Sequence, residues 1–136
     1  MTDVMNILSI DYGEKRIGFA IGDTERKIPN PLQVIQNNSI VSIIEEIKKI
    51  VLSYNVEKIV IGIPLNEDSS IGEQSNIVKE FSLIIEKELN IDVIGVDERF
   101  SSVDAEKLLL EQDMSRKKRK KIIDALAASI ILQRYF

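Results

Sequence analysis

Short apolar runs separated by polar turns dominate the first third of the chain. The runs at Met5–Ile10 and Ile17–Ile21 have the length of buried strands, and the tight DYGEKR connection between them predicts a β-hairpin. The segment IPNPLQVIQ predicts a third strand at an edge of the sheet, because its two prolines cannot donate to a central ladder. The chain therefore opens with three strands.

Beyond residue 38, apolar residues recur at the spacing of helices, and these segments alternate with strands. From Ser39 onward the apolar positions follow i, i+3, i+4 and i+7, which predicts an amphipathic helix. The runs KIVIGI and IDVIGV predict two further strands. Between them a second helix is predicted, with one apolar face made of Ile77, Phe81, Ile84, Ile85 and Leu89.

The pattern of the C-terminal third is helical. Ser101 and Asp104 have capping-box spacing, which predicts a helix through about Leu110, and a last helix is predicted over Ile122–Tyr135. The resulting order is βββαβαβαα, with helical crossovers between the later strands. This order predicts one α/β domain over residues 1–136, built on a mixed five-stranded sheet with helices on both faces.

The 136 residues include neither cysteine nor histidine. Their absence removes Ser-His-Asp and Cys-His catalysis and the usual nitrogen and sulfur ligands of zinc, so any metal should be a hard cation held by oxygen. No apolar stretch approaches the roughly 20 residues of a membrane span, and the N-terminus lacks the features of a secretory signal. We therefore expect a cytoplasmic protein without a membrane partner.

Positive charge is concentrated in one segment. The formal net charge is -4, yet six of the 18 basic residues are consecutive, at positions 116–121 in SRKKRKK. This run predicts a positive patch that contacts phosphates, and a solvated helix start explains it equally well. The candidate phosphate-binding residues here are Arg116, Lys117, Lys118, Lys120 and Lys121.

Three acidic residues occupy positions where apolar neighbours make an unpaired charge costly. Asp11 ends the first strand, Glu98, beside Asp97, ends the last strand, and Asp124 lies in the apolar segment IIDALAASII. If the first and last strands are neighbours, Asp11 and Glu98 share the crevice at the strand ends. The small residues Ala127 and Ala128 let the final helix approach the sheet, so Asp124 can join them.

We predict that Asp11, Glu98 and Asp124 form a catalytic site that holds Mg²⁺ or Mn²⁺. Clustered carboxylates repel one another, divalent cations make the cluster favourable, and such sites suit in-line attack of water on a phosphodiester. Structural explanations remain open for each residue: a hairpin turn, an ion pair with Arg99, or a solvent-facing position on the helix. Asp97 is an alternative to Glu98 as the ligand.

Four motifs carry a family resemblance. They are ILSIDYGEKRIGFAIGD, IVIGIPLNEDSSIGEQ, VIGVDERFSSVDAEKLL and RKKIIDALAASIILQRYF, and together they span essentially the whole chain. The chain resembles the YqgF family, also called RuvX, of pre-16S rRNA nucleases once grouped with Holliday-junction resolvases. The resemblance implies an RNase H-like fold and metal-binding roles for Asp11, Glu98 and Asp124. The other motif residues are Gly13, Lys15, Arg16, Asn66 and Arg99.

The same resemblance implies a nucleic acid as the partner, either structured or single-stranded RNA or four-way DNA junctions, bound by a monomer or homodimer. Lys15 and Arg16 are near the proposed site and either meet phosphates or form a solvated hairpin tip. Asn66 is in a polar segment that either binds substrate or serves only as a connection. Gly13 is expected to supply a positive φ or a close backbone approach. The resemblance leaves a resolvase-like DNA endonuclease acting in recombination and repair as the alternative nuclease. Two other rival functions are actin-like ATPase chemistry, because Asp11 to Gly18 fits D-x-G-x-x-x-x-G, and a non-catalytic nucleic-acid-binding module.

Overall fold

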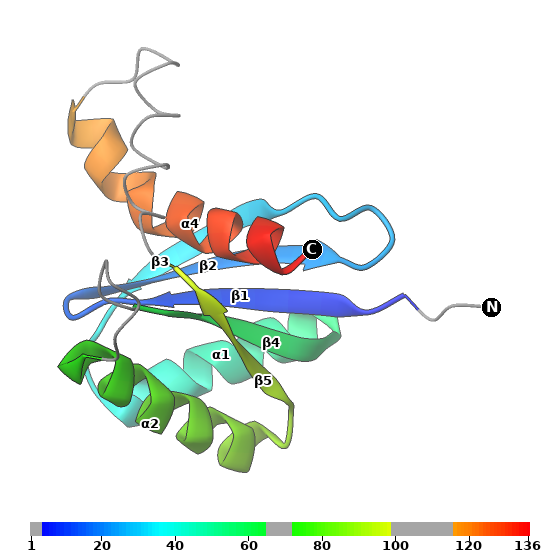
Figure 1. Ribbon diagram of the computed structural model, residues 1–136, viewed down its shortest axis with the longest axis horizontal. Coiled ribbons are helices and arrows are strands. Elements are labelled where there is room, and N and C mark those ends of the chain that lie inside the picture. The colour runs from blue at the N-terminus through cyan, green and yellow to red at the C-terminus, as the bar shows by residue number, and fades with distance from the viewer. Residues whose placement is uncertain (1–3, 65–71, 99–115) are drawn as a thin grey trace.

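The computed structural model describes residues 4–64, 72–98 and 116–136, and within the last range it leaves out the side chains of residues 116–122 and 124 (Figure 1). The predicted helix from Ser101 to Leu110 lies outside the described residues, as do Asn66 and Arg99. None of the helices in the described ranges combines the length and the apolar character needed to cross a bilayer.

A mixed sheet of five strands forms the centre of the fold, in the order β3-β2-β1-β4-β5. The first three strands are antiparallel, whereas β1, β4 and β5 run parallel to one another. The predicted sheet, the hairpin and the edge position of the proline-containing strand are confirmed. The bounds are Asn6–Tyr12 for β1, Arg16–Asp23 for β2, Asn30–Gln36 for β3, Val56–Ile63 for β4 and Val93–Asp97 for β5.

The supposition that the first and last strands are neighbours is wrong, because β4 lies between β1 and β5. The order of strands depends on pairing between segments far apart in the sequence, and the hydrophobic pattern of a single strand does not determine which strands are its neighbours. The C-terminal ends of β1, β4 and β5 nevertheless share one edge of the sheet, since all three strands are parallel.

Helices cover both faces of the sheet, as predicted (Figure 1). α1 (Ile40–Tyr54) and α2 (Glu73–Leu89) lie on one face, and α4 (Arg116–Tyr135) lies on the other. Ser39 caps α1 by accepting a hydrogen bond from the Ser42 N–H at 3.2 Å. Each face has its own apolar core, the larger beneath α1 and α2 and the smaller, around Ile7 and Val60, beneath α4.

Two helix predictions need correction. The face of α2 that packs on the sheet carries Ser75, Val78, Phe81 and Ile85, while Ile77 and Ile84 are 41% and 40% exposed. Two contacts fix this rotation: the Ser75 hydroxyl donates to the Pro64 carbonyl, and the Phe81 ring packs on Tyr12 with 4.2 Å between centroids. α4 begins at Arg116 and not at Ile122, because lysine and arginine are good helix formers.

Candidate metal centre

Asp11 and Glu98 meet at the edge where the parallel strands end. Asp11 is the last residue but one of β1, and Glu98 directly follows β5. The Glu98 N–H donates to the Ile63 carbonyl of β4 at 3.2 Å, which continues the parallel ladder one step beyond the strand. The side chains of Glu98 and Asp11 are hydrogen-bonded to each other. The structure thus brings together two of the three predicted acidic residues.

Both carboxylates lie on the face of the sheet that α4 covers. The buried Ser9 hydroxyl donates to the Ala128 carbonyl of α4 at 2.8 Å, so Ser9 faces that helix. Side chains alternate along a strand, which puts Asp11 on the same face as Ser9. Val96 packs in the core beneath α4, and Glu98 follows it by two residues.

Asp97 lies on the opposite face by the same alternation, and its side chain is exposed. Its carbonyl accepts a hydrogen bond from Arg134 Nη1 at 2.9 Å, which ties the end of β5 to the last turn of α4. Glu98, rather than Asp97, is therefore the residue that faces Asp11.

The pKa of Glu98 is raised from an ordinary 4.5 to about 9. Burial is the largest cause, the hydrogen bond with Asp11 and the negative charges of Asp11 and Asp97 act in the same direction, and the positive charge of Arg134 opposes them. Without a cation, the pair thus holds a proton at neutral pH. Asp11 and Glu98 are both half-buried, and two such carboxylates are a suitable donor set for a hard divalent cation, because a cation would replace the proton and offset their mutual repulsion.

The predicted metal site includes a third acidic residue, Asp124, in addition to this pair. Among the side chains that the structure describes, no three Asp, Glu, His or Cys groups gather closely enough to hold a metal ion. Asp124 belongs to α4, but its side chain lies outside the described part of the chain. Ala127 and Ala128 are fully buried, as expected for a helix that approaches the sheet closely.

Replacing Glu98 by glutamine should stabilise the metal-free protein at neutral and higher pH. A folded-state pKa above the unfolded value means that the folded chain retains a proton that the unfolded chain has lost, so stability falls as pH rises from about 4.5 to 9. Glutamine keeps the hydrogen bond to Asp11 and removes this dependence. We expect a gain on the order of 2 kcal/mol at pH 7, which shrinks toward pH 4.

Urea unfolding in EDTA at several pH values measures this effect. Glu57→Gln is the matched control, because Glu57 is an exposed residue of β4 far from Asp11. Parallel stability curves for wild type and Glu98→Gln across this pH range would contradict the paired-carboxylate description.

The predicted basic residues of the hairpin lie close in sequence to Asp11. Lys15 and Arg16 are exposed at the β1–β2 turn, which is held by a hydrogen bond from the Gly13 N–H to the Arg16 carbonyl at 3.0 Å. The φ of Gly13 is not positive, so that expectation was wrong. The alternative, close approach, is correct: a Cβ at Gly13 would lie 2.5 Å from the Arg16 carbonyl oxygen.

The basic run occupies the first turns of α4, and its side chains lie outside the described residues. Ser9 is a residue of the site region that the sequence analysis missed. Its signal was a single hydroxyl within the apolar run ILSI, which in a buried strand requires a hydrogen-bond partner.

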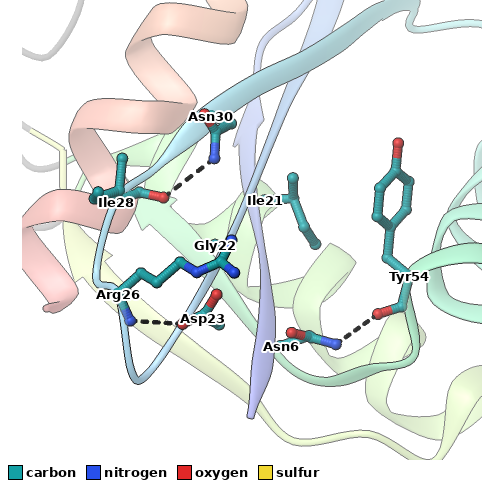
Figure 2. Close-up of a pocket in the computed structure, with 8 residues that line it drawn as sticks. All are labelled: Asn6, Ile21, Gly22, Asp23, Arg26, Ile28, Asn30 and Tyr54. Atoms are coloured by element: carbon teal, nitrogen blue, oxygen red, sulfur yellow. Dashed lines mark hydrogen bonds between the residues drawn. The ribbon is translucent and has the colours of Figure 1, made fainter. Parts of the chain in front are cut away.

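A cavity of about 360 Å³ lies at the other end of the sheet (Figure 2). Asn6, at the start of β1, donates to the Tyr54 carbonyl at 2.8 Å on one side of this cavity. On the other side, Asp23 Oδ1 accepts from the Arg26 N–H at 2.7 Å. None of the predicted site residues lines the cavity, so it is separate from the Asp11–Glu98 pair.

Solved structures define the class of fold. The chain is similar to Thermus thermophilus RuvC in complex with a Holliday junction substrate, with a TM-score of 0.60 and 15% identity over 96% of this chain and 94% of that one. It is also similar to the fowlpox virus resolvase in complex with Holliday junction DNA, with a TM-score of 0.58 and 15% identity over 96% of each chain. These similarities confirm the predicted RNase H-like fold.

Sequence comparison defines the family. The profile of the RuvX family, described as "Holliday junction resolvase", matches residues 5–136, and the chain belongs to this family. A relative from Caldanaerobacter subterraneus subsp. tengcongensis, named "Putative pre-16S rRNA nuclease", is 45% identical over 132 residues, which are 96% of this chain and 95% of the relative. The resemblance inferred from the four motifs is confirmed.

Proposed function

We propose that this protein is a metal-dependent nuclease that hydrolyses phosphodiester bonds in the precursor of 16S ribosomal RNA, in processing of its 5′ end. The observation that carries the proposal is the hydrogen-bonded Asp11–Glu98 pair at the C-terminal edge of the parallel strands. Membership of the RuvX family and a relative named for pre-16S rRNA support the reaction and the substrate. Because ribosomal RNA of bacteria is processed in the cytoplasm, we propose that the protein acts there.

Asp124 is the third acidic ligand in this proposal, and the register between α4 and β1 supports it. Ile131 and Leu132 pack in one core with Ile7, and Ala128 is bonded to Ser9. Two residues along a strand span about 6.7 Å, and four residues along a helix span about 6.0 Å. Moving two residues forward along β1 therefore corresponds to moving about four residues backward along α4. Since Ser9 is level with Ala128, Asp11 should be level with position 124.

The carboxylates hold and orient the catalytic cations, which are Mg²⁺ or Mn²⁺ because the donors are all oxygen. The chemistry that a pair of such cations supplies is activation of a water and stabilisation of the leaving oxygen. Burial beneath α4 limits access of bulk water to Glu98, which strengthens its electrostatic interactions. Glu98 must release its proton before it can act as a ligand, so cation affinity should rise with pH up to about 9.

Basic side chains on both sides of the carboxylates are proposed to hold the nucleic acid. Lys15 and Arg16 project from the hairpin that follows Asp11, and the basic run precedes Asp124 on α4. Asn66 follows the end of β4 by three residues in the sequence and is proposed to contribute its amide to the same contacts. Contacts of this kind position a strand without reading its bases.

The experiment that tests this function compares two substrates under identical conditions. One is an RNA fragment that spans the 5′ end of 16S RNA with its precursor extension, and the other is a four-way DNA junction. We expect cleavage of the RNA that depends on Mg²⁺ or Mn²⁺ and stops in EDTA. Cleavage of the junction alone would support the resolvase function described for the family, and binding of either substrate without cleavage would support a non-catalytic module.

A further inference from the structure

Two strand spacings separate the backbones of Asp11 and Glu98. β4 lies between β1 and β5, and neighbouring strands are about 4.8 Å apart, so the two backbones are roughly 10 Å from each other. Their side chains are nevertheless hydrogen-bonded. The contact therefore has to be made above β4, on the face that α4 covers.

Gly62 is the residue of β4 that lies beneath this contact. Val60 pairs with Ser9 and Gly62 pairs with Val96, so Gly62 faces α4 together with Asp11 and Glu98. A Cβ atom built on Gly62 would lie 2.5 Å from Glu98 Oε2 and 2.8 Å from Glu98 Cβ. The Glu98 carboxylate occupies the space that any side chain at position 62 would need.

α4 closes the same space from above. The Cδ1 atom of Ile131 would lie 2.6 Å from a Cβ at Gly62, so Glu98 has no room to rise over a larger residue. The φ of Gly62 is not positive, so its backbone conformation does not require glycine. Lack of space is the reason for glycine at this position, and the side chain that uses the space belongs to Glu98.

We propose that Gly62 is a positioning residue of the metal centre. Because Gly62 has no side chain, the Glu98 side chain can extend over β4 and reach Asp11. This inference rests on the proposed function, since it assigns a purpose to bringing the two carboxylates together. It also explains why position 98 carries glutamate and position 11 carries the shorter aspartate, because only the side chain at position 98 extends over a neighbouring strand. The sequence signal was a glycine within the strand KIVIGI, which marks a close approach.

The test is a double-mutant cycle on Mn²⁺ affinity, measured by calorimetry for wild type, Gly62→Ala, Glu98→Gln and the double variant. Because Gly62→Ala displaces Glu98, it should weaken Mn²⁺ binding by about tenfold or more. In the Glu98→Gln background the ligand is already lost, so Gly62→Ala should add little. Additive losses would overturn the proposal, because they would mean that Gly62 acts independently of Glu98.

Gly22→Ala is the matched control. Gly22 is also a strand glycine beneath α4, where a Cβ would lie 3.1 Å from Leu132 Cδ2, but it lies at the far end of the sheet. We expect Gly22→Ala to lower the melting temperature without changing Mn²⁺ affinity. If Gly62→Ala does not fold, the whole cycle is repeated in an Ile131→Val background, which removes the Cδ1 atom and leaves Glu98 as the close contact of the new Cβ. Failure of Gly62→Ala to fold in that background as well would overturn the proposal.

The outcomes separate this inference from the function on which it rests. If Glu98→Gln weakens Mn²⁺ binding and Gly62→Ala does not, Gly62 has no positioning role and the proposed metal centre stands. If Glu98→Gln itself leaves Mn²⁺ binding unchanged, the proposed metal centre is wrong, and Gly62 does not position a metal ligand.

Discussion

Replacing Asp11 by asparagine is expected to reduce RNA cleavage on the order of 10³-fold while the protein remains folded. Loss of a residue that merely orients a metal ligand typically lowers affinity or activity 10- to 100-fold, and Asp11 is proposed as a direct ligand. Asparagine keeps the shape and one oxygen but removes the charge that holds the cation. It also relieves the repulsion with Glu98, so the metal-free variant should be at least as stable as wild type.

Single-turnover cleavage of the precursor RNA in Mg²⁺, with thermal unfolding of the same samples, measures both effects. Asp92→Asn is the matched control, because Asp92 is an exposed acid that precedes β5 at the opposite end of the strand from Glu98. Retained cleavage in Asp11→Asn would remove this residue from the site. Loss of cleavage together with unfolding would indicate a structural role for the carboxylate.

The second large effect concerns the basic start of α4. Changing Lys117, Lys118, Lys120 and Lys121 together to alanine should weaken RNA binding at low salt on the order of 10²-fold, because four phosphate contacts and their released counterions are lost. Each lost contact should flatten the log-affinity against log-salt slope by about 0.7 for a single strand and about 0.9 for a duplex. Relative affinities for different sequences should stay the same.

Titrations of labelled RNA between 50 and 300 mM salt test this expectation. The matched control is the quadruple alanine variant of Lys48, Lys49, Lys79 and Lys87, which removes the same charge from exposed positions on α1 and α2. An equal change of slope in both variants would mean that net charge alone explains the binding. An unchanged slope in the first variant would make the run at 116–121 a solvated helix start.

Much of the fold was predictable because local pattern and packing agree. The two prolines of the third strand predicted its position at an edge of the sheet. The spacing after Ser39 predicted the buried residues Ile43, Ile47 and Ile50 of α1, although Ile40 at its start is exposed. The rotation of α2 was not predictable, because Ile77 and Val78 are both apolar and only tertiary contacts decide between them. The Ser75–Pro64 hydrogen bond and the Tyr12–Phe81 ring contact settle that choice, and in both the partner of the helix residue lies outside α2.

The acidic pair was predictable for a different reason. A charge at the end of a buried strand needs a partner, and this argument singled out Asp11 and Glu98. Their meeting was predicted on the supposition that the first and last strands are neighbours, whereas β4 lies between them. The way they meet was not predictable, because it depends on β4 pairing with both neighbours and on the space left at Gly62. The link between Ser9 and Ala128 spans 119 residues, so it too becomes visible only in the folded chain.

The most direct test of the proposed centre is to locate Mn²⁺ by anomalous diffraction in crystals of the wild-type protein. We predict a peak on the α4-facing side of the sheet, within about 2.5 Å of carboxylate oxygens of Asp11, Glu98 and Asp124. A peak that contacts Asp97 or the cavity beside Asp23 instead, or no peak at Asp11 and Glu98 at a Mn²⁺ concentration that supports cleavage, would contradict the account.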